Sequence, residues 1–212
     1  METKDKIFAK CLMDIKAVML RPDKPFVWAF GWHSPIYCDN RKILSHPSLR
    51  TFARDAIADV IAGKYPDAEI VAGVATGAIA IGALVADKLQ KPFIYVRPKP
   101  KDHGTGSQIE GILEPGRKVV VVEDLISTGM SSLAAVDALR KAEADVLGMV
   151  ALFTYGFTLS LEQFRNSDVE LTTLSDYPAL LETAKETGYI GASDYDMLKE
   201  WRNSPSTWGQ EK

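Results

Sequence analysis

The chain contains 212 residues, with 25 Lys and Arg against 28 Asp and Glu, which gives a formal net charge of −3. Because 46% of the residues are hydrophobic and 25% are charged, the composition excludes a disordered or collagen-like chain. The mild acidity argues against non-specific nucleic-acid binding, which needs a strong basic excess. The length predicts one domain over residues 1–212.

The first 45 residues are expected to form a helix followed by a hairpin. Apolar residues at helical spacing predict a helix from about residue 4 to residue 19, and two prolines within 21–25 end it. Aromatic residues alternate with small ones over 26–32, which predicts a strand with one aromatic face. Residues 34–39 are expected to be the return strand.

After a predicted helix over about 47–63, the pattern changes to short apolar runs separated by helical patterns. The five runs are Ile70–Val74, Phe93–Val96, Val119–Val122, Val146–Phe153 and Val169–Leu174. Continuous runs rich in Val and Ile are typical of strands buried on both faces. They predict an α/β fold with a mostly parallel five-stranded sheet flanked by helices, a core over about 65–175, and C-terminal helices and a tail over 176–212.

Two observations bear on where the protein acts. The uncharged stretch over 70–86 reaches only the short limit for a membrane span, and its glycines favour a strand, a turn and a packed helix. No membrane association is therefore expected. Cys11 and Cys38 are too few for a disulfide scaffold or a structural zinc site, and residues 1–10 carry no signal-peptide hydrophobic region. A cytoplasmic protein is expected.

Residues 119–132 read VVVVEDLISTGMSS and carry the strongest functional signal. Four valines form a strand that should end at the acid pair Glu123 and Asp124, and a hydroxyl-rich turn with Gly129 then opens a helix. Such a turn at the carboxyl end of a parallel strand binds phosphate through backbone N–H groups and the helix dipole. The acids would bind ribose hydroxyls or a metal ion; the alternative is that they are exposed strand-end acids beside helix-capping serines.

Residues 97–111 read RPKPKDHGTGSQIEG and show no core pattern. A loop of this length in a compact domain is usually functional. Its cationic side chains, Arg97, Lys99, Lys101 and His103, would suit a diphosphate leaving group, on which negative charge grows as the bond breaks. The alternative is a solvated basic loop.

The 119–132 segment closely resembles the signature by which type I phosphoribosyltransferases bind 5-phospho-α-D-ribose 1-diphosphate (PRPP), in the version found in orotate phosphoribosyltransferases. KDHG at 101–104 resembles that family's catalytic loop, residues 34–41 resemble the hood over the orotate ring, and 73–77 resemble its pyrophosphate loop. The resemblance runs from about Lys6 to Trp201, and four pieces in the right order are more specific than any one of them.

The resemblance implies a type I phosphoribosyltransferase-like fold with residues 1–45 as the hood. It also implies Mg²⁺-dependent transfer of ribose 5-phosphate from PRPP to orotate. The products are orotidine 5′-monophosphate and diphosphate, in de novo pyrimidine (UMP) biosynthesis. The implied partners are these small-molecule substrates and a second copy of the chain, in a homodimer whose catalytic loops reach across to shared active sites.

The same resemblance assigns roles to individual residues. Lys101, His103 and Asp124 are the expected catalytic residues. The expected PRPP contacts are Arg97, Lys101, His103, Glu123, Asp124, Leu125, Ile126, Ser127, Thr128, Gly129, Met130 and Ser131. Orotate is expected to contact Tyr37, Cys38 and Ser127. The cofactor Mg²⁺ is expected to be held mainly by PRPP, near Glu123 and Asp124.

The sequence departs from the family pattern at several positions. Phe30 stands where a serine is usual, His33 where a lysine or arginine is common, and Met130 where a small residue is usual. The run 152–156 offers no arginine, although some relatives hold orotate with one at that place. These departures concern the base contacts more than PRPP binding.

Two other functions remain as alternatives. In the first, the acceptor is another base, such as a purine, but the hood and the KDHG loop argue against it. A non-catalytic PRPP-sensing regulator of transcription would need a DNA-binding module. The region before residue 65 shows no helix-turn-helix, and the net charge is −3.

Overall fold

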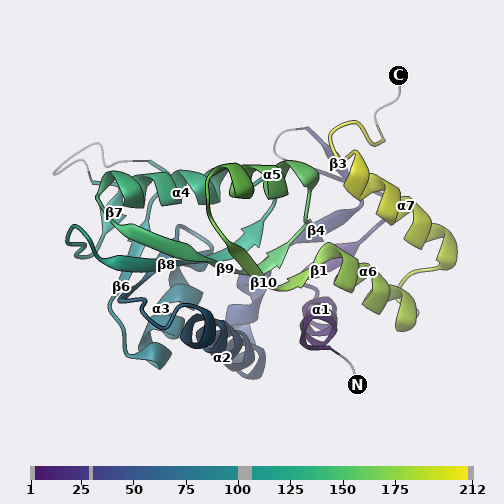
Figure 1. The fold of residues 1–212 in the computed structure, drawn as a ribbon. Coiled ribbons are helices and arrows are strands. Elements are labelled where there is room, and N and C mark those ends of the chain that lie inside the picture. Colours follow the sequence, from purple (N-terminus) through teal and green to yellow (C-terminus); the bar gives the residue numbers. More distant parts are fainter. Residues whose placement is uncertain (1–2, 29–30, 100–106, 210–212) are drawn as a thin grey trace.

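A computed structural model describes residues 3–28, 31–99 and 107–209 (Figure 1). Its centre is a six-stranded sheet in the order β10-β9-β8-β5-β6-β7. The strands are β5 (Ile70–Val74), β6 (Phe93–Val96), β7 (Ile109–Glu110), β8 (Lys118–Ile126), β9 (Asp145–Thr154) and β10 (Leu171–Asp176). The mostly parallel α/β fold is confirmed. The sixth strand, β7, pairs antiparallel with β6 and lies in the segment that was expected to be only a loop.

Helices cover both faces of the sheet (Figure 1). One face carries α1 (Lys4–Asp14), α2 (Pro47–Lys64) and α3 (Ala78–Leu89), and the other carries α4 (Met130–Lys141) and α5 (Thr158–Asn166). The valines of β8 divide between the two layers. Val120 and Val122 pack in the cluster with α1, α2 and α3, whereas Val119 and Val121 pack with α4. Side chains alternate along a strand, so burial on both faces explains the unbroken apolar run.

The hood differs from its expected form. Helix α1 ends at Asp14, because Lys16 adopts a left-handed backbone with φ 54° and the chain then turns into β1 (Val18–Leu20). The expected helix to residue 19 is therefore one turn too long. A single hairpin was also expected, but two short ladders form instead. β2 (Phe26–Val27) pairs with β3 (His33–Ser34), and β4 (Ile36–Cys38) pairs with β1. Pro35, which has no N–H to donate, separates β3 from β4.

The C-terminal helices complete this end of the molecule (Figure 1). Helix α6 (Tyr177–Glu186) follows β10, and α7 (Ala192–Asn203) lies beside the hood strands. Trp201 of α7 is fully buried and belongs to the same core cluster as Phe8 of α1 and Val122 of β8. The hood, the sheet and the C-terminal region therefore share one hydrophobic core. The 3-10 helix η1 (Asn40–Ser45) leads from the hood into α2.

Candidate functional site

The acid pair lies inside strand β8 rather than after it. The strand was expected to end at Glu123, but it continues to Ile126, which pairs with Thr154 of β9. Ile126 is fully buried, and this packing extends the strand beyond the two charged residues. Because neighbouring side chains of a strand point to opposite faces, Glu123 and Asp124 cannot both face one ligand in the same way.

Glu123 turns into the protein on the α4 side. Its side chain is 4% exposed, and its two oxygens accept hydrogen bonds of 2.8 Å from the backbone N–H of Asp124 and from the hydroxyl of Ser132. Burial raises the pKa of this carboxyl, and the nearby Asp124 charge raises it further. Glu123 therefore ties the end of β8 to the first turn of α4.

Asp124 faces the opposite side, where three segments of the chain meet. Its carboxylate lies so close to Gly77 that a Cβ on that glycine would overlap it. Its backbone carbonyl accepts a 2.6 Å hydrogen bond from Nδ2 of Asn40, whose side chain is buried. The carboxylate of Asp124 thus stands between the β5–α3 turn and the hood, and it is better placed than Glu123 to bind a sugar hydroxyl.

The turn after β8 has the geometry of an anion site. Gly129 caps α4 with φ 86°, a left-handed conformation that favours glycine. The helix begins at Met130, so the N–H groups of its first turn have no carbonyl four residues earlier in the helix and can bind an anion. Ser127 and Thr128 are half-buried, and the Met130 side chain is 63% exposed. Met130 therefore leaves the turn open.

Of the expected PRPP contacts that the structure describes, Ile126 is placed unfavourably. Its side chain is in the core, and its carbonyl already accepts from the backbone N–H of Tyr155 at 3.0 Å. In the β5–α3 turn, one backbone N–H group is already used within the protein, because the Ala75 N–H donates to the carbonyl of Val96 at 2.9 Å. Thr76 is exposed there, and the Ala75–Thr76 peptide is cis.

The three residues expected to contact the base lie together. Tyr37, Cys38 and Ser127 line one cavity of about 320 Å³. The other lining residues are Val27, Trp28, Leu125 and Tyr155. The cavity is mainly apolar with a few polar groups at its edge, which is the usual character of a site for a flat organic ring.

The thiol in this cavity is neutral at physiological pH. Burial raises the pKa of Cys38, and the carboxylates of Asp124 and Asp39 raise it further. Its Sγ donates to Oδ1 of Asn40 at 3.2 Å. Asn40 therefore contacts the cavity-lining Cys38 with one side-chain atom and the Asp124 backbone with the other.

Sequence reasoning did not identify three residues of this site. Asn40 lies within the hood segment 34–41, and its polar side chain two residues after Cys38 was the available signal. For Trp28 the sequence signal was only its place in an aromatic strand face. Tyr155 belongs to the run 152–156, whose sequence signal was the absence of an arginine. These residues meet the rest of the site only in three dimensions.

The expected catalytic loop lies largely outside the described residues, which include neither Lys101 nor His103. Arg97, at the end of β6, is described. Its backbone N–H donates to the carbonyl of Gln108 at 2.8 Å, and its Nη1 lies 3.8 Å from a carboxylate oxygen of Glu110. The roles expected for Lys101 and His103 stay predictions.

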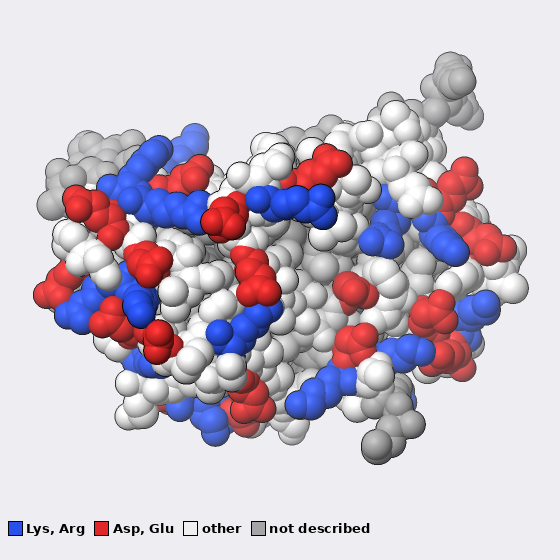
Figure 2. Space-filling model, in the orientation of Figure 1, with Lys and Arg blue, Asp and Glu red and all other residues white. Residues whose placement is uncertain are grey.

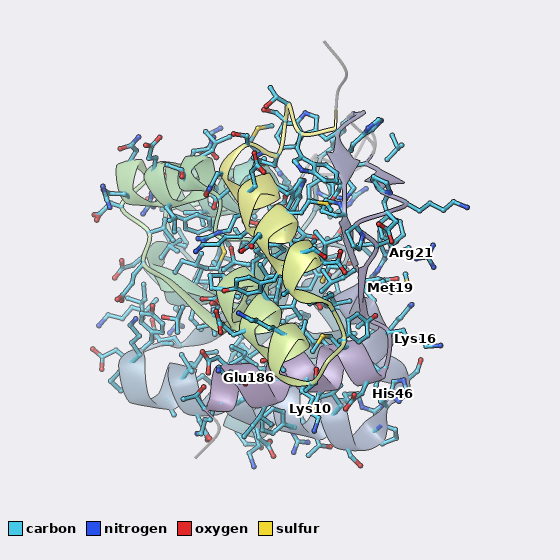
Figure 3. All side chains as sticks on the ribbon, turned by 90° about the vertical axis from the view of Figure 1, so that its right-hand side faces the viewer. Lys10, Lys16, Met19, Arg21, His46 and Glu186 are labelled. Carbon is cyan, nitrogen blue, oxygen red and sulfur yellow. The ribbon has the colours of Figure 1, made fainter. Side chains whose placement is uncertain are left out.

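A larger hollow, of about 540 Å³, lies elsewhere, between α1, β1 and the turn after α6. Lys10, Lys16 and Arg21 line it together with Asp14 and Tyr189. Figure 3 shows Lys10 where α1 meets the end of α6, and Lys16 and Arg21 on the hood side of the same face. Asp14 at the C-terminal end of α1 and Thr187, which follows α6, both line this hollow.

On the face drawn in Figure 2, Lys and Arg are interspersed with Asp and Glu and form no continuous basic surface. Among the described residues, no helix is long and apolar enough to cross a bilayer. The described part of the chain likewise holds no group of three or more His, Cys, Asp and Glu residues arranged to bind a metal.

The chain is similar to known proteins over nearly its whole length. Residues 40–172 match the family model described as the phosphoribosyl transferase domain. An orotate phosphoribosyltransferase of Porphyromonas gingivalis is 53% identical over 209 residues, covering 99% of this chain and 100% of that protein. One of Bacteroides thetaiotaomicron is 54% identical over 208 residues, or 98% of both chains.

Solved structures show the same fold. The crystal structure of orotate phosphoribosyltransferase from Aeropyrum pernix matches with a TM-score of 0.75 and 33% identity, over 87% of this chain and 99% of that one. The enzyme of Mycobacterium tuberculosis in complex with PRPP matches with a TM-score of 0.66 and 20% identity, over 84% of this chain and 99% of that one.

Proposed function

This chain belongs to the orotate phosphoribosyltransferases of the phosphoribosyltransferase family, and on that premise we propose that it transfers ribose 5-phosphate from PRPP to N1 of orotate. In this reaction the bond from ribose C1 to the diphosphate oxygen breaks, and its electron pair leaves with diphosphate. A bond from C1 to N1 forms, and orotate N1 loses its proton. The observation that carries the proposal is the adjacency of the base cavity to Asp124 and the 127–131 turn.

PRPP would bind along the carboxyl ends of β8 and β5. The turn over 127–131 would hold the 5′-phosphate through the N–H groups that begin α4. Asp124 would accept hydrogen bonds from the ribose hydroxyls, while Glu123 keeps the strand and helix in place from the buried side. Positive charge develops on ribose at C1 in the transition state, and the Asp124 carboxylate stabilises it electrostatically.

Orotate would occupy the 320 Å³ cavity beside Ser127. Tyr37 and Trp28 offer aromatic surface to a planar ring, and the Ser127 hydroxyl offers a hydrogen bond at the edge nearest the ribose. Because the walls are mainly apolar and the thiol of Cys38 is neutral, the cavity suits a planar ring and presents no competing nucleophile at neutral pH.

The diphosphate would leave toward the β5–α3 turn and the loop after β6. Arg97 stands at the start of that loop, and Lys101 and His103 would stabilise the growing negative charge. We extend the proposal to a homodimer in which this loop serves the partner's site, and to a cytoplasmic role in de novo pyrimidine synthesis.

The residues present fit Mg²⁺ that arrives with PRPP rather than one held in a protein cage. Both oxygens of Glu123 already accept hydrogen bonds, so Asp124 is the carboxylate of the pair that faces the substrate side. Mg²⁺ bound with PRPP would supply positive charge beside the diphosphate, and Asp124 is the carboxylate that would face it. Removing it with EDTA is expected to stop turnover.

The decay of orotate ultraviolet absorbance tests the proposal. The protein is mixed with orotate, PRPP and Mg²⁺, and the controls omit PRPP or contain excess EDTA. Decay that needs both PRPP and Mg²⁺ supports the reaction. Decay with another base but not with orotate would assign a different acceptor, and no turnover with any base, combined with salt-sensitive DNA binding, would favour a regulator.

A further inference from the structure

Arg202 of the C-terminal helix α7 holds the turn that follows β9. Its Nε donates to the backbone carbonyl of Tyr155 at 3.2 Å, and its Nη2 donates to the carbonyl of Gly156 at 2.9 Å. The two carbonyls are 46 or more residues away in the sequence. A planar guanidinium can satisfy two successive carbonyls in one fixed geometry, which an ammonium group cannot reproduce.

The turn held in this way forms part of the base cavity. Tyr155 lines the cavity beside Ser127, while Gly156 has φ 62° and completes the change of direction after the strand. The Tyr155 ring lies 5.2 Å from the ring of Trp28, another lining residue, and stacks on Phe157 at 5.4 Å between centroids. The position of the Tyr155 backbone therefore sets the position of one wall.

Trp201, the residue before Arg202, makes a second tie to the same region. It is fully buried, and its Nε1 donates to the backbone carbonyl of His33 in hood strand β3 at 3.3 Å. Its ring lies 5.8 Å from the rings of both Trp28 and Tyr155, edge-on to each. Two neighbouring residues of α7 thus hydrogen-bond to the hood and to the turn after β9.

We propose that Arg202 is a positioning residue for the base: by fixing the Tyr155–Gly156 turn it sets the affinity of the cavity for orotate without touching PRPP. The inference rests on the proposed function. The main effect is expected on the base because Tyr155 itself lines the base cavity. The expected phosphate turn, 127–131, meets the turn held by Arg202 only indirectly, through the Ile126 carbonyl that accepts from the Tyr155 N–H, and the strand before it is joined to α4 by Glu123 and Ser132.

The chain contains a matched control for this arginine. Arg140, at the end of α4, also donates to two successive backbone carbonyls, those of Ser167 at 2.7 Å and Asp168 at 3.0 Å. This pair follows α5 and does not line the base cavity. Replacing Arg140 therefore removes the same kind of double hydrogen bond at a place where it has no role in binding the base.

The experiment compares the unsubstituted protein with Arg202→Gln, Arg202→Lys and Arg140→Gln. Orotate and PRPP are varied separately in the absorbance assay. Arg202→Gln is expected to raise the KM for orotate about tenfold, the effect of losing roughly one charge-assisted hydrogen bond. The KM for PRPP is expected to stay within about twofold. Arg202→Lys should recover part of the loss because it keeps one charged donor, and Arg140→Gln should leave both KM values unchanged.

Three results would overturn the inference: an unchanged KM for orotate in folded Arg202→Gln, an equal rise in both KM values, or the same orotate effect in Arg140→Gln. If Arg202→Gln fails to fold, Arg202→Lys decides in the same way by its ratio of the two KM values. The unsubstituted protein is measured first. Absence of orotate turnover there refutes the proposed function itself, whereas normal turnover with an unaltered ratio in the variants refutes only the role of Arg202.

Discussion

Two sides of the candidate site differ in how many segments of the chain build them. The phosphate side is made of consecutive residues, 127–131, between the end of β8 and the first turn of α4. The base side takes its walls from β2, β4, β8 and the residue after β9, and α7 supports it from behind. Local backbone geometry is enough for the phosphate turn, whereas the base cavity exists only when four distant segments have packed. We therefore expect distant substitutions to affect base binding more than phosphate binding.

The largest effect is expected from Gly77→Ala, because Gly77 lies directly against the Asp124 carboxylate that is proposed to bind the ribose of PRPP. A Cβ there would overlap the carboxylate of Asp124, so that carboxylate must move. A displacement of about 1 Å in a positioning group can cost about 10²-fold, and kcat/KM for PRPP is expected to fall by that order. Gly63→Ala is the control, because a Cβ at Gly63 in α2 meets nothing within 4 Å. A normal kcat/KM in Gly77→Ala would exclude the proposed role of Asp124.

The next effect is expected at Asn40, which joins the two sides. Asn40→Ala removes the hydrogen bond to the Asp124 carbonyl and the acceptor of the Cys38 thiol. Leaving buried polar groups unpaired costs about 1–3 kcal/mol of unfolding free energy, measured by urea titration. Both KM values are expected to rise, by about tenfold for each 1.4 kcal/mol lost in binding. Exposed Asn166 gives the control variant Asn166→Ala. A change in only one KM would show that Asn40 serves one side alone.

The rate at which Cys38 is alkylated tests the base side without a measurement of turnover. Because burial and the neighbouring carboxylates raise the pKa of its thiol, little thiolate is present at pH 8. In a Cys11→Ala variant, alkylation of Cys38 by iodoacetamide is expected to be at least about tenfold slower in the folded protein than in urea. Equal rates would mean that the cavity is open to solvent and that the thiol titrates normally.

The smallest effect is a pH dependence of stability at Glu123. Its pKa is raised above the ordinary value of 4.5 in the folded protein. Its contribution to stability is therefore complete below that value, and it is lost as the pH rises through the folded pKa. In Glu123→Gln this loss disappears. The difference between the unfolding free energy of the variant and that of the unsubstituted protein should therefore increase in favour of the variant as the pH rises from 5 to 8. Each unit of raised pKa corresponds to about 1.4 kcal/mol. Parallel pH profiles of the two proteins would contradict this.

The parts of the fold that could be predicted are those coded by local patterns. The five parallel strands were predicted because a strand buried on both faces must be apolar throughout, and Val119–Val122 is such a run. β7 has only two residues and gains its pairing from β6, so no local pattern marked it. The end of α1 was misplaced because Val18 has helical spacing in the sequence but pairs with Cys38 of β4.

By itself, the sequence determined the order of strands and helices and the place of the turn over 127–131 that is expected to bind phosphate, because both depend on neighbours within a few residues. It also placed Tyr37, Cys38 and Ser127 in one site through their resemblance to a known pattern. Only the tertiary structure showed that the side chains of Glu123 and Asp124 face opposite sides of the sheet, because the sequence could not show that β8 continues past them. Only the tertiary structure brought Tyr155 into the wall of the base cavity and placed Asn40 and Arg202 where they hydrogen-bond to its lining residues. Their contacts span up to 84 residues of chain, and contacts at that separation arise from packing rather than from local propensity.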